Sequence, residues 1–255
     1  VALFDADIRT FTPLYPSRMI LPLLDESYGI SYVKAFYSRL SLETNQLQGR
    51  ATRLFVGPLL ASLEQLVGNG PFLQYLQSFR YPLAGEFAFT KDLAMNLRIP
   101  CDWGLEIGLL SEMQRNQAYN RICQVDIADS YDHKHQPLSE ENRDAGLSKM
   151  SIDITKTLIR KLAAQGDTFT HNTLRTLKAT YYRTALDLLE TYYNDAKING
   201  LNLNINEEEI AIELFANNII IAGQEFLDNP NQNPLITNWN RVETAMPDIK
   251  KRFLE

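Results

Sequence analysis

The sequence predicts an α/β domain over residues 1–140 followed by a helical extension over residues 141–255, and three observations carry this prediction. The chain opens on a short apolar run, residues 1–4, that is typical of a buried strand. Seven of the eleven prolines then interrupt short apolar runs before residue 101, which favours strands, turns and short helices. From about residue 140 the apolar residues recur at spacings of three and four, the period of amphipathic helices.

The first predicted strand indicates where the fold begins. The chain has no initiator Met, and Val1 already falls within the strand. A buried strand has neighbours in its sheet, so we expect the fold to begin upstream of residue 1. We also expect residues 1–3 to pair with strands from that upstream segment.

Three long helices are expected in the second region. Polar residues at 139–142 supply an N-cap and first-turn acids for the first helix. The second helix covers residues 171–199 and ends at Gly200, a residue type common just after a helix C-terminus. The third begins at Asn206, where three glutamates complement the helix dipole, and runs to about Asp228.

Composition narrows the class of protein. The 255 residues are 45% hydrophobic and carry a formal net charge of −6, which suits one large domain or two small ones and disfavours nucleic-acid binding. The two cysteines, Cys101 and Cys123, exclude a disulfide scaffold and are compatible with a reducing cytoplasm. Uninterrupted apolar runs are far shorter than a bilayer requires, so we expect a cytoplasmic protein without a transmembrane segment.

Two acidic residues, Asp5 and Asp7, directly follow the first predicted strand. In open α/β sheets, ligands bind at the carboxyl ends of the strands. Carboxylate oxygens suit Mg²⁺ or Mn²⁺ together with the diphosphate that such an ion bridges. The tripeptide Asp5-Ala6-Asp7 is also common in solvated turns, and its place after an apolar strand is what favours a metal site.

Two of the three histidines lie close together, in residues 132–138. In one interpretation, one imidazole completes the metal shell begun by Asp5 or Asp7, while Lys134 faces phosphate oxygens. In the other, His133 and His135 belong to an exposed loop. A separate zinc site would need a further ligand at suitable spacing, and none is visible nearby.

Three further segments combine small and charged residues. Gly49-Arg50-Ala51-Thr52-Arg53 offers close backbone approach, two cations and a hydroxyl to a phosphate or carboxylate, although a helix start with solvated arginines explains it equally well. Residues 82–86 either let the backbone approach a ligand or form a tight turn. Glu106 leads an apolar run and is expected at the start of a buried helix, as a cap or as an active-site carboxylate.

Taken together and in this order, the segments resemble the glucosyl-3-phosphoglycerate synthases, which are retaining glycosyltransferases with a GT-A fold. Over about residues 1–165 the resemblance is carried by Phe4-Asp5-Ala6-Asp7-Ile8, Gly49-Arg50-Ala51-Thr52, Pro82-Leu83-Ala84-Gly85-Glu86-Phe87-Ala88, Gly104-Leu105-Glu106-Ile107-Gly108-Leu109-Leu110, Gln124-Val125-Asp126 and His133-Lys134-His135-Gln136-Pro137-Leu138. It implies a Rossmann-like nucleotide-diphospho-sugar transferase fold that lacks its N-terminal part here. Residues 1–140 would then be the C-terminal half of the catalytic domain, with the metal and acceptor site.

The resemblance also implies roles for individual residues. The implied ligands of Mg²⁺ or Mn²⁺ are Asp5, Asp7 and His133, and the metal would stabilise the departing diphosphate. The implied donor-binding residues are Asp5, Ala6, Leu83, Ala84 and Gly85. The implied acceptor-binding residues are Gly49, Arg50, Ala51, Thr52, Lys134 and His135. Glu106 matches the acid near the sugar and the acceptor hydroxyl, where it would position the reactants for a front-face displacement.

The implied reaction moves a hexose, expected to be glucose, from a sugar nucleotide (UDP-glucose or a GDP-sugar) to 3-phosphoglycerate. The product, glucosyl-3-phosphoglycerate, would serve compatible-solute or polysaccharide synthesis. Three residues, Ala51, Arg53 and His135, depart from the family pattern around the acceptor, and Asp102-Trp103-Gly104 is similar to mannosylglycerate synthases. The alternative is therefore a glucosylglycerate or mannosylglycerate synthase that uses glycerate directly.

A third interpretation is a non-catalytic GT-A-like binding protein with a helical dimerisation module. Tyrosine stripes at helical spacing in the second region suit a core or a homodimer interface. The retained acids and His133 argue against loss of catalysis, because a pseudo-enzyme is expected to lose its metal ligands first. We therefore expect an enzyme, and a homodimer.

Overall fold

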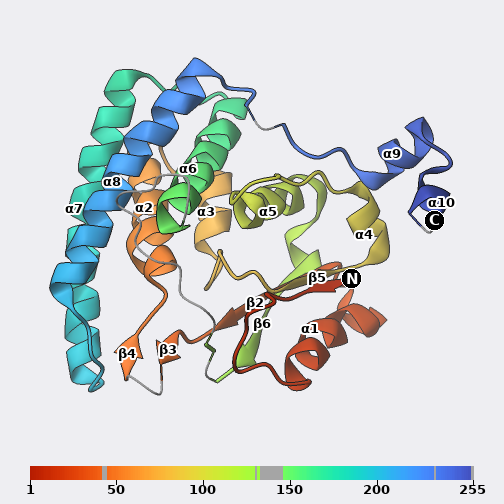
Figure 1. The fold of residues 1–255 in the computed structure, drawn as a ribbon, viewed down its shortest axis with the longest axis horizontal. Helices are drawn as coiled ribbons and strands as arrows, with labels where there is room; N and C mark the ends of the chain where they lie inside the picture. The colour runs from red at the N-terminus through yellow and green to blue at the C-terminus, as the bar shows by residue number, and fades with distance from the viewer. Residues whose placement is uncertain (42–44, 130, 133–145, 233, 254–255) are drawn as a thin grey trace.

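A four-stranded mixed sheet organises the first region (Figure 1). The computed structural model describes residues 1–41, 45–129, 131–132, 146–232 and 234–253. The strand order is β1 (Ala2–Leu3), β5 (Phe87–Phe89), β2 (Tyr32–Tyr37) and β6 (Ile122–Ala128). β2 and β6 are parallel, and β5 is antiparallel to both of its neighbours. Two short strands, β3 (Leu40–Ser41) and β4 (Gln46–Leu47), form a separate hairpin.

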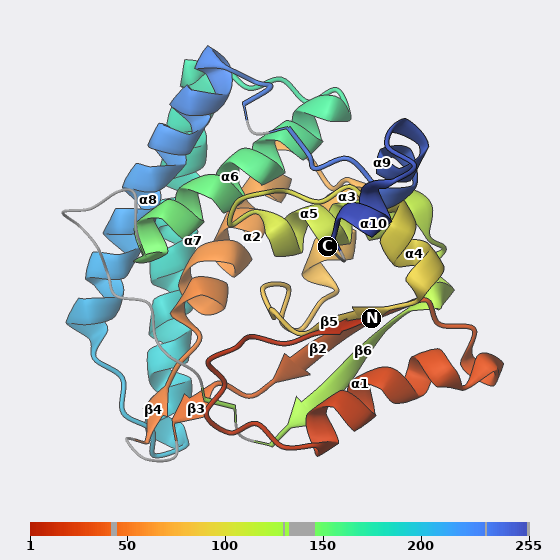
Figure 2. The ribbon, with the colours of Figure 1, turned by 45° about the vertical axis from the view of Figure 1, so that its right-hand side comes forward.

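The alternation of side chains along β2 separates two hydrophobic clusters. Val33 and Ala35 face α1 (Leu14–Leu24), whereas Tyr32 joins the larger cluster on the opposite face. Figure 2 shows α1 beneath the sheet and the helices of the larger cluster above it. On this upper side lie α2 (Gly57–Val67), α3 (Pro71–Gln77), α4 (Lys91–Asn96) and α5 (Leu105–Asn116). The sheet is thus covered on both faces, as α/β architectures require.

The first predicted strand is present as a short edge strand, and the described residues do not test its predicted burial. β1 is two residues long and lies at an edge of the sheet, where β5 is its one neighbour among the described residues. Val1 is 63% and Leu3 is 39% exposed, because an edge strand with one neighbour leaves part of its surface in solvent. Pairing of residues 1–3 with an upstream segment stays a prediction.

Helices fill the second region, and their limits follow the predicted ones closely. The second and third predicted helices are α7 (His171–Ile198) and α8 (Ile205–Asp228). The first corresponds to α6 (Gly146–Ala164), and its expected N-cap at residues 139–142 lies outside the described residues. Two short helices, α9 (Trp239–Ala245) and α10 (Ile249–Arg252), follow and project from the body (Figure 1).

The helical region shares a core with the α/β region. The rings of Phe55 and Phe215 lie 5.0 Å apart, which joins α8 to the segment before α2. The Tyr181 hydroxyl of α7 donates a hydrogen bond of 2.6 Å to the Leu54 carbonyl. α6, α7 and α8 therefore pack as part of one structure with the first region, although the division at residue 140 itself stays a prediction.

α8 is the one helix of the described chain that is long and apolar enough, by length and composition, to cross a membrane. In the fold, 44% of its most apolar window is buried, and it packs against both α6 and α7. The core helix of a soluble protein passes the same test.

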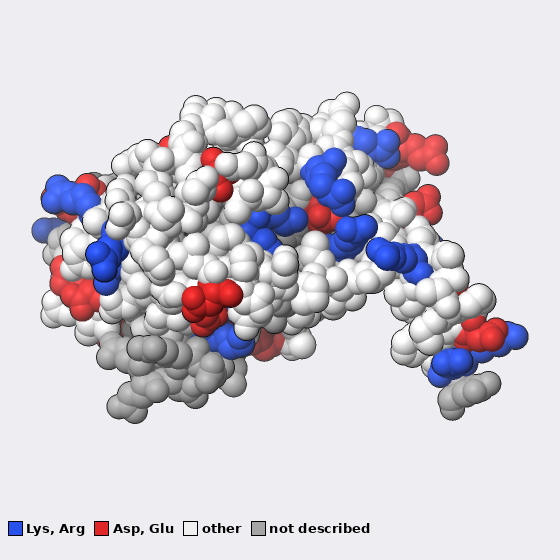
Figure 3. All heavy atoms as spheres, turned by 90° about the horizontal axis from the view of Figure 1, so that it is seen from above, with Lys and Arg blue, Asp and Glu red and all other residues white. Residues whose placement is uncertain are grey.

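Figure 3 shows Lys and Arg interspersed with Asp and Glu over one face of the molecule, with α9 and α10 projecting at its edge.

Candidate active site

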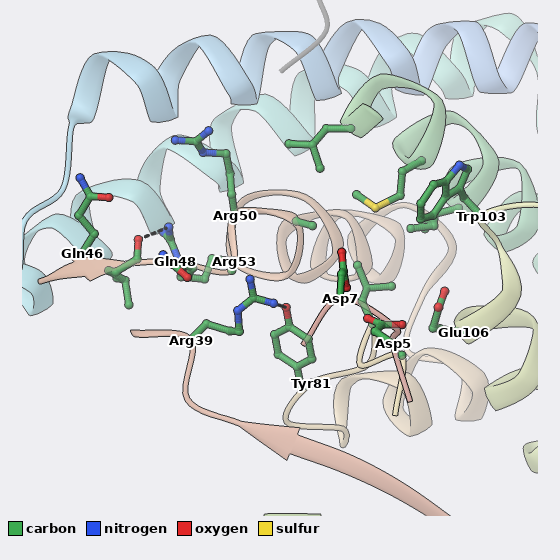
Figure 4. A pocket seen from close by; sticks show the side chains of 18 of the residues that line it. Asp5, Asp7, Arg39, Gln46, Gln48, Arg50, Arg53, Tyr81, Trp103 and Glu106 are labelled. Carbon is green, nitrogen blue, oxygen red and sulfur yellow. Dashed lines mark hydrogen bonds between the residues drawn. The ribbon is translucent and has the colours of Figure 1, made fainter. Parts of the chain in front are cut away.

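A cavity of about 610 Å³ opens between the ends of the strands, the segment that leads into α2 and the helices α5, α6 and α8. Its walls contain nine residues that the sequence singles out for metal, donor or acceptor binding: Asp5, Ala6, Asp7, Gly49, Arg50, Ala51, Leu83, Gly85 and Glu106. Figure 4 shows the two aspartates and Glu106 at one end of this cavity and Arg50 at the other. Residues that lie up to 101 positions apart in the chain therefore meet in one place.

The two aspartates leave β1 together and line the cavity in a turn. Gly85 lies directly against Asp5: a Cβ atom added at Gly85 would come within 2.8 Å of the Asp5 carboxylate carbon. Glycine is thus required where residues 83–85, which we call the donor loop because this segment is expected to bind the donor, pass the carboxylate. Two carboxylates on one turn form a set of hard oxygen donors that fits a divalent cation such as Mg²⁺ or Mn²⁺. The third expected ligand, His133, lies outside the described residues.

The buried carboxylate of Glu86 supports the turn that carries the two aspartates. Glu86 is fully buried and accepts hydrogen bonds from the hydroxyls of Tyr37, at 2.8 Å, and Tyr131. It also accepts a long hydrogen bond of 3.5 Å from the Asp5 backbone N–H. Burial raises the pKa of the Tyr37 hydroxyl, which remains a donor to the Glu86 carboxylate. The turn that carries Asp5 therefore rests on a carboxylate held by two buried phenols.

Lys34 is a functional candidate that the sequence reasoning missed. It is 1% exposed on β2, and its ammonium donates to the Ala84 carbonyl of the donor loop. Burial lowers the pKa of Lys34 to about 8, against the opposing charges of Glu106, Glu86 and Asp5. A single lysine within the otherwise uncharged strand Tyr32–Tyr37 was the available signal.

Glu106 lies in the first turn of α5, as the sequence predicts. Burial raises the pKa of its carboxyl group, and the charge of Lys34 opposes this shift. Glu106 is partly exposed to the cavity, and its carboxyl group interacts electrostatically with the buried ammonium of Lys34. Glu106 can therefore orient a ligand hydroxyl inside the cavity.

The segment Gly49–Arg53, which we call the acceptor loop after its expected role, begins at Gly49, whose φ of +79° favours glycine. The Gly49 carbonyl accepts from the backbone N–H groups of Thr52 and Arg53, both at 3.0 Å, and this starts the π-helical segment Ala51–Val56 that leads into α2. Thr52 and Ala84 lie outside the set of cavity-lining residues. The Thr52 hydroxyl is nevertheless buried, without a hydrogen-bond partner among the described residues.

The helical extension contributes a carboxylate to this loop. Glu208 of α8 is 4% exposed and lies between two arginines: its Oε1 is 2.9 Å from Arg50 Nε, and its Oε2 is 3.0 Å from Arg53 Nη2. Glu207 adds an exposed ion pair with Arg50 at 3.6 Å. Sequence reasoning missed Glu208, because 158 positions separate it from Arg50 and no local pattern connects them.

Two predicted acceptor residues, Lys134 and His135, lie outside the described residues. Within the described part of the chain, no group of three or more His, Cys, Asp or Glu residues converges on a metal site. The cavity also contains residues that the sequence did not predict, among them Arg39, Tyr81 and Gln48. Arg39 and Tyr81 lie between the acceptor loop and the two aspartates (Figure 4).

No family model matches this chain. It is, however, 41% identical over 254 residues to the glucosyl-3-phosphoglycerate synthase of Persephonella marina, and 41% identical over 256 residues to that of Methanococcoides burtonii. Both matches cover all of this chain and 62% of the relative. The chain thus spans about three fifths of the length of these curated relatives.

Solved structures agree with the sequence relatives. The glucosyl-3-phosphoglycerate synthase of Mycobacterium tuberculosis, in complex with Mn²⁺, UDP-glucose and phosphoglyceric acid, matches with a TM-score of 0.51 and 30% identity, over 64% of this chain and 49% of that one. A complex of the same enzyme with Mn²⁺, UDP and phosphoglyceric acid also gives 0.51. The resemblance found in the sequence is confirmed: the chain is similar along its whole length to curated glucosyl-3-phosphoglycerate synthases, and 64% of it matches the GT-A fold of the solved enzyme.

Proposed function

We propose that the protein containing this chain is a metal-dependent retaining glycosyltransferase that moves glucose from UDP-glucose to 3-phosphoglycerate. The observation that supports this most strongly is the single cavity, which joins the acids at Asp5 and Asp7, the donor loop at Gly85, the acceptor loop at Arg50 and the carboxylate of Glu106. The relatives at 41% identity bear the name of this activity. The M. tuberculosis enzyme binds UDP-glucose and phosphoglyceric acid together.

In this proposal, Asp5-Ala6-Asp7 is the D-x-D motif, and its two carboxylates hold Mg²⁺ or Mn²⁺, with His133 as the third protein ligand. The bound metal supplies Lewis-acid stabilisation of the leaving diphosphate. Gly85 leaves space for the Asp5 carboxylate, and the buried Glu86 holds the Asp5 backbone. The M. tuberculosis enzyme was solved with Mn²⁺, which agrees with an oxygen-rich site.

Glu106 positions the donor sugar and the acceptor hydroxyl rather than attacking the sugar. The leaving phosphate accepts the acceptor proton in a front-face displacement, so the carboxylate need not form a covalent intermediate. Glu106→Gln keeps the shape of the side chain and removes its charge, and kcat should fall about a hundredfold through misorientation. Full turnover with unchanged substrate affinities would exclude this role.

One observation favours a second candidate acceptor, glycerate itself. The Arg50 and Arg53 guanidiniums, which would face an acceptor phosphate, are already engaged by Glu208. That leaves less positive charge for a multiply charged anion. A product assay with UDP-glucose and Mn²⁺, run in parallel with 3-phosphoglycerate and with glycerate, separates the two. Glucosyl-3-phosphoglycerate as the preferred product supports the main proposal, and glucosylglycerate supports the alternative.

We further propose a cytoplasmic homodimer in which α8 is an internal helix. Both cysteines, Cys101 and Cys123, are unbridged, as in a reducing compartment. α8 places Glu208 inside the protein, in contact with two arginines, and such an arrangement favours a packed helix over a membrane span. Light scattering of the purified protein without detergent tests the dimer and the internal position of α8. A monomeric species would contradict the dimer, and a protein that needs detergent to stay in solution would contradict an internal α8.

A further inference from the structure

Arg39 follows β2, and its side chain lines the same cavity (Figure 4). Its Nη1 donates a long hydrogen bond of 3.5 Å to the Tyr81 hydroxyl, and its guanidinium lies 5.8 Å from the centre of the Tyr131 ring. Its Nε is buried and has no hydrogen-bond acceptor among the described residues. A guanidinium N–H that is taken out of water without an acceptor is costly, so this group is suited to receive one from a ligand.

The other two arginines of the cavity, unlike Arg39, form ion pairs with a carboxylate of the protein. Arg50 and Arg53 both form ion pairs with the buried Glu208, at 2.9 and 3.0 Å. Arg39 has no carboxylate within ion-pair distance among the described residues. Two arginines of the cavity thus share the carboxylate of Glu208, although Arg53 Nη1 is also buried without an acceptor among the described residues. Arg39 differs from both because none of the described carboxylates forms an ion pair with it.

The backbone and the side-chain stem of Arg39 contact the segment Gln48–Gly49. Its carbonyl accepts the Gln48 backbone N–H at 2.8 Å. Its side-chain stem packs against Gly49, where an added Cβ would lie 3.2 Å from Arg39 Cβ. Arg39 is thus fixed to the acceptor loop, and any movement of that loop moves the guanidinium with it. Gly49 and the stem of Arg39 are therefore in close contact, so the loop and the arginine form one surface.

We propose that Arg39, supported by Tyr81, is an anion-binding residue of the acceptor subsite that binds the carboxylate or phosphate of the acceptor. This rests on the proposed glucosyl transfer. A guanidinium offers two parallel N–H donors to either anionic group, which Arg50 cannot do while Glu208 occupies its Nε and one Nη. Arg39 would then determine preference for acidic acceptors over neutral polyols.

The test compares Arg39→Gln and Arg39→Lys with the wild type in the natural full-length protein. The matched control is Arg175→Gln, because Arg175 is exposed on α7 and lies outside the cavity-lining set. Steady-state kinetics with UDP-glucose and Mn²⁺ use 3-phosphoglycerate, glycerate and glycerol 3-phosphate as acceptors. Calorimetric titration of each acceptor in the presence of UDP and Mn²⁺ gives a second readout that does not depend on turnover.

Arg39→Gln should raise KM and Kd for the acidic acceptor about ten- to a hundredfold, the usual cost of losing a hydrogen bond to a charged group. The KM for UDP-glucose and the melting temperature should stay at the wild-type values, and Arg39→Lys should recover part of the acceptor affinity. Glycerate distinguishes carboxylate binding from phosphate binding, since it lacks the phosphate, and glycerol 3-phosphate lacks the carboxylate.

Three results would overturn the inference: unchanged acceptor affinity in Arg39→Gln, a loss confined to UDP-glucose, or a loss accompanied by an equal fall in stability. The last would give Arg39 a purely structural role through Tyr81 and Tyr131. In each of these cases the wild type remains active, so the proposed function stands. A wild-type protein that neither binds nor glucosylates any of the three acceptors would instead overturn the proposed function, and this inference with it.

Discussion

The ion pairs of Glu208 give a prediction that the structure makes quantitative. Glu208→Gln keeps the shape of the side chain but removes the charge that Arg50 and Arg53 share. Removing one member of a buried ion pair costs about 3–5 kcal/mol, because the remaining charge is left buried. Arg53 retains the Gln48 carbonyl at 2.8 Å and the Leu47 carbonyl at 3.4 Å, so we expect the lower end, about 3 kcal/mol.

For a chain of this size, 1 kcal/mol corresponds to about 2–4 °C in melting temperature, which gives a fall of about 6–12 °C. Thermal unfolding of wild type and variant, followed by circular dichroism, measures it. Glu207→Gln is the matched control: Glu207 is 59% exposed and 3.6 Å from Arg50, and exposed pairs contribute at most about 1 kcal/mol. Equal melting temperatures for the two variants would refute the inference that Glu208 is a buried structural charge.

Two further predictions concern the donor side of the cavity. Gly85→Ala should abolish Mn²⁺-dependent binding of UDP-glucose, because the new Cβ would lie within 2.8 Å of the Asp5 carboxylate. Calorimetric titration of UDP-glucose measures this, with Gly70→Ala as the control because a Cβ there meets nothing within 4 Å. Equal affinities of the two variants for UDP-glucose would contradict the prediction. Lys34→Met should remove a pH dependence of stability. Since burial lowers the folded-state pKa of Lys34 from 10.5 to about 8, the unfolded chain binds more protons between these values, and the wild-type unfolding free energy should rise relative to the variant across that range, by roughly 3 kcal/mol. Urea unfolding curves of both proteins from pH 8 to pH 10.5 measure this, and parallel pH profiles would contradict it.

Features with a local signal were predictable from the sequence. The limits of α7 and α8 follow from Gly200 and from the glutamates after Asn206, and the structure places both helices within one residue of the predicted limits. Glu106 has the predicted place at a helix start, because an acid before an apolar run describes a first turn. The convergence of Asp5 and Glu106 on one cavity was implied by the family resemblance, and no spacing in the sequence alone requires it.

Features set by distant packing were not predictable. Glu208 lies more than 150 positions from Arg50 and Arg53, and no local pattern indicates that the three side chains meet. Thr52 was expected to bind the acceptor; it lies outside the set of cavity-lining residues, and its role stays a prediction. The pKa of Lys34 is lowered because the side chain is buried in the folded protein. Its place in an otherwise uncharged strand was the only sequence signal for this burial.

The position of Glu208 changes how the helical extension should be understood. Arg53 holds the acceptor loop through the carbonyls of Gln48 and Leu47, and Glu208 holds Arg53 from the opposite side. The loop is therefore fixed between its own backbone and a helix that begins more than 150 residues later. Because Glu208 already pairs with Arg50 and Arg53, we expect anion binding to depend more on Arg39, which forms no ion pair with a described carboxylate. Because one carboxylate both stabilises the loop and sets the charge of the cavity, substitutions in α8 should alter acceptor choice and stability together, whereas substitutions at Arg39 should alter acceptor choice alone.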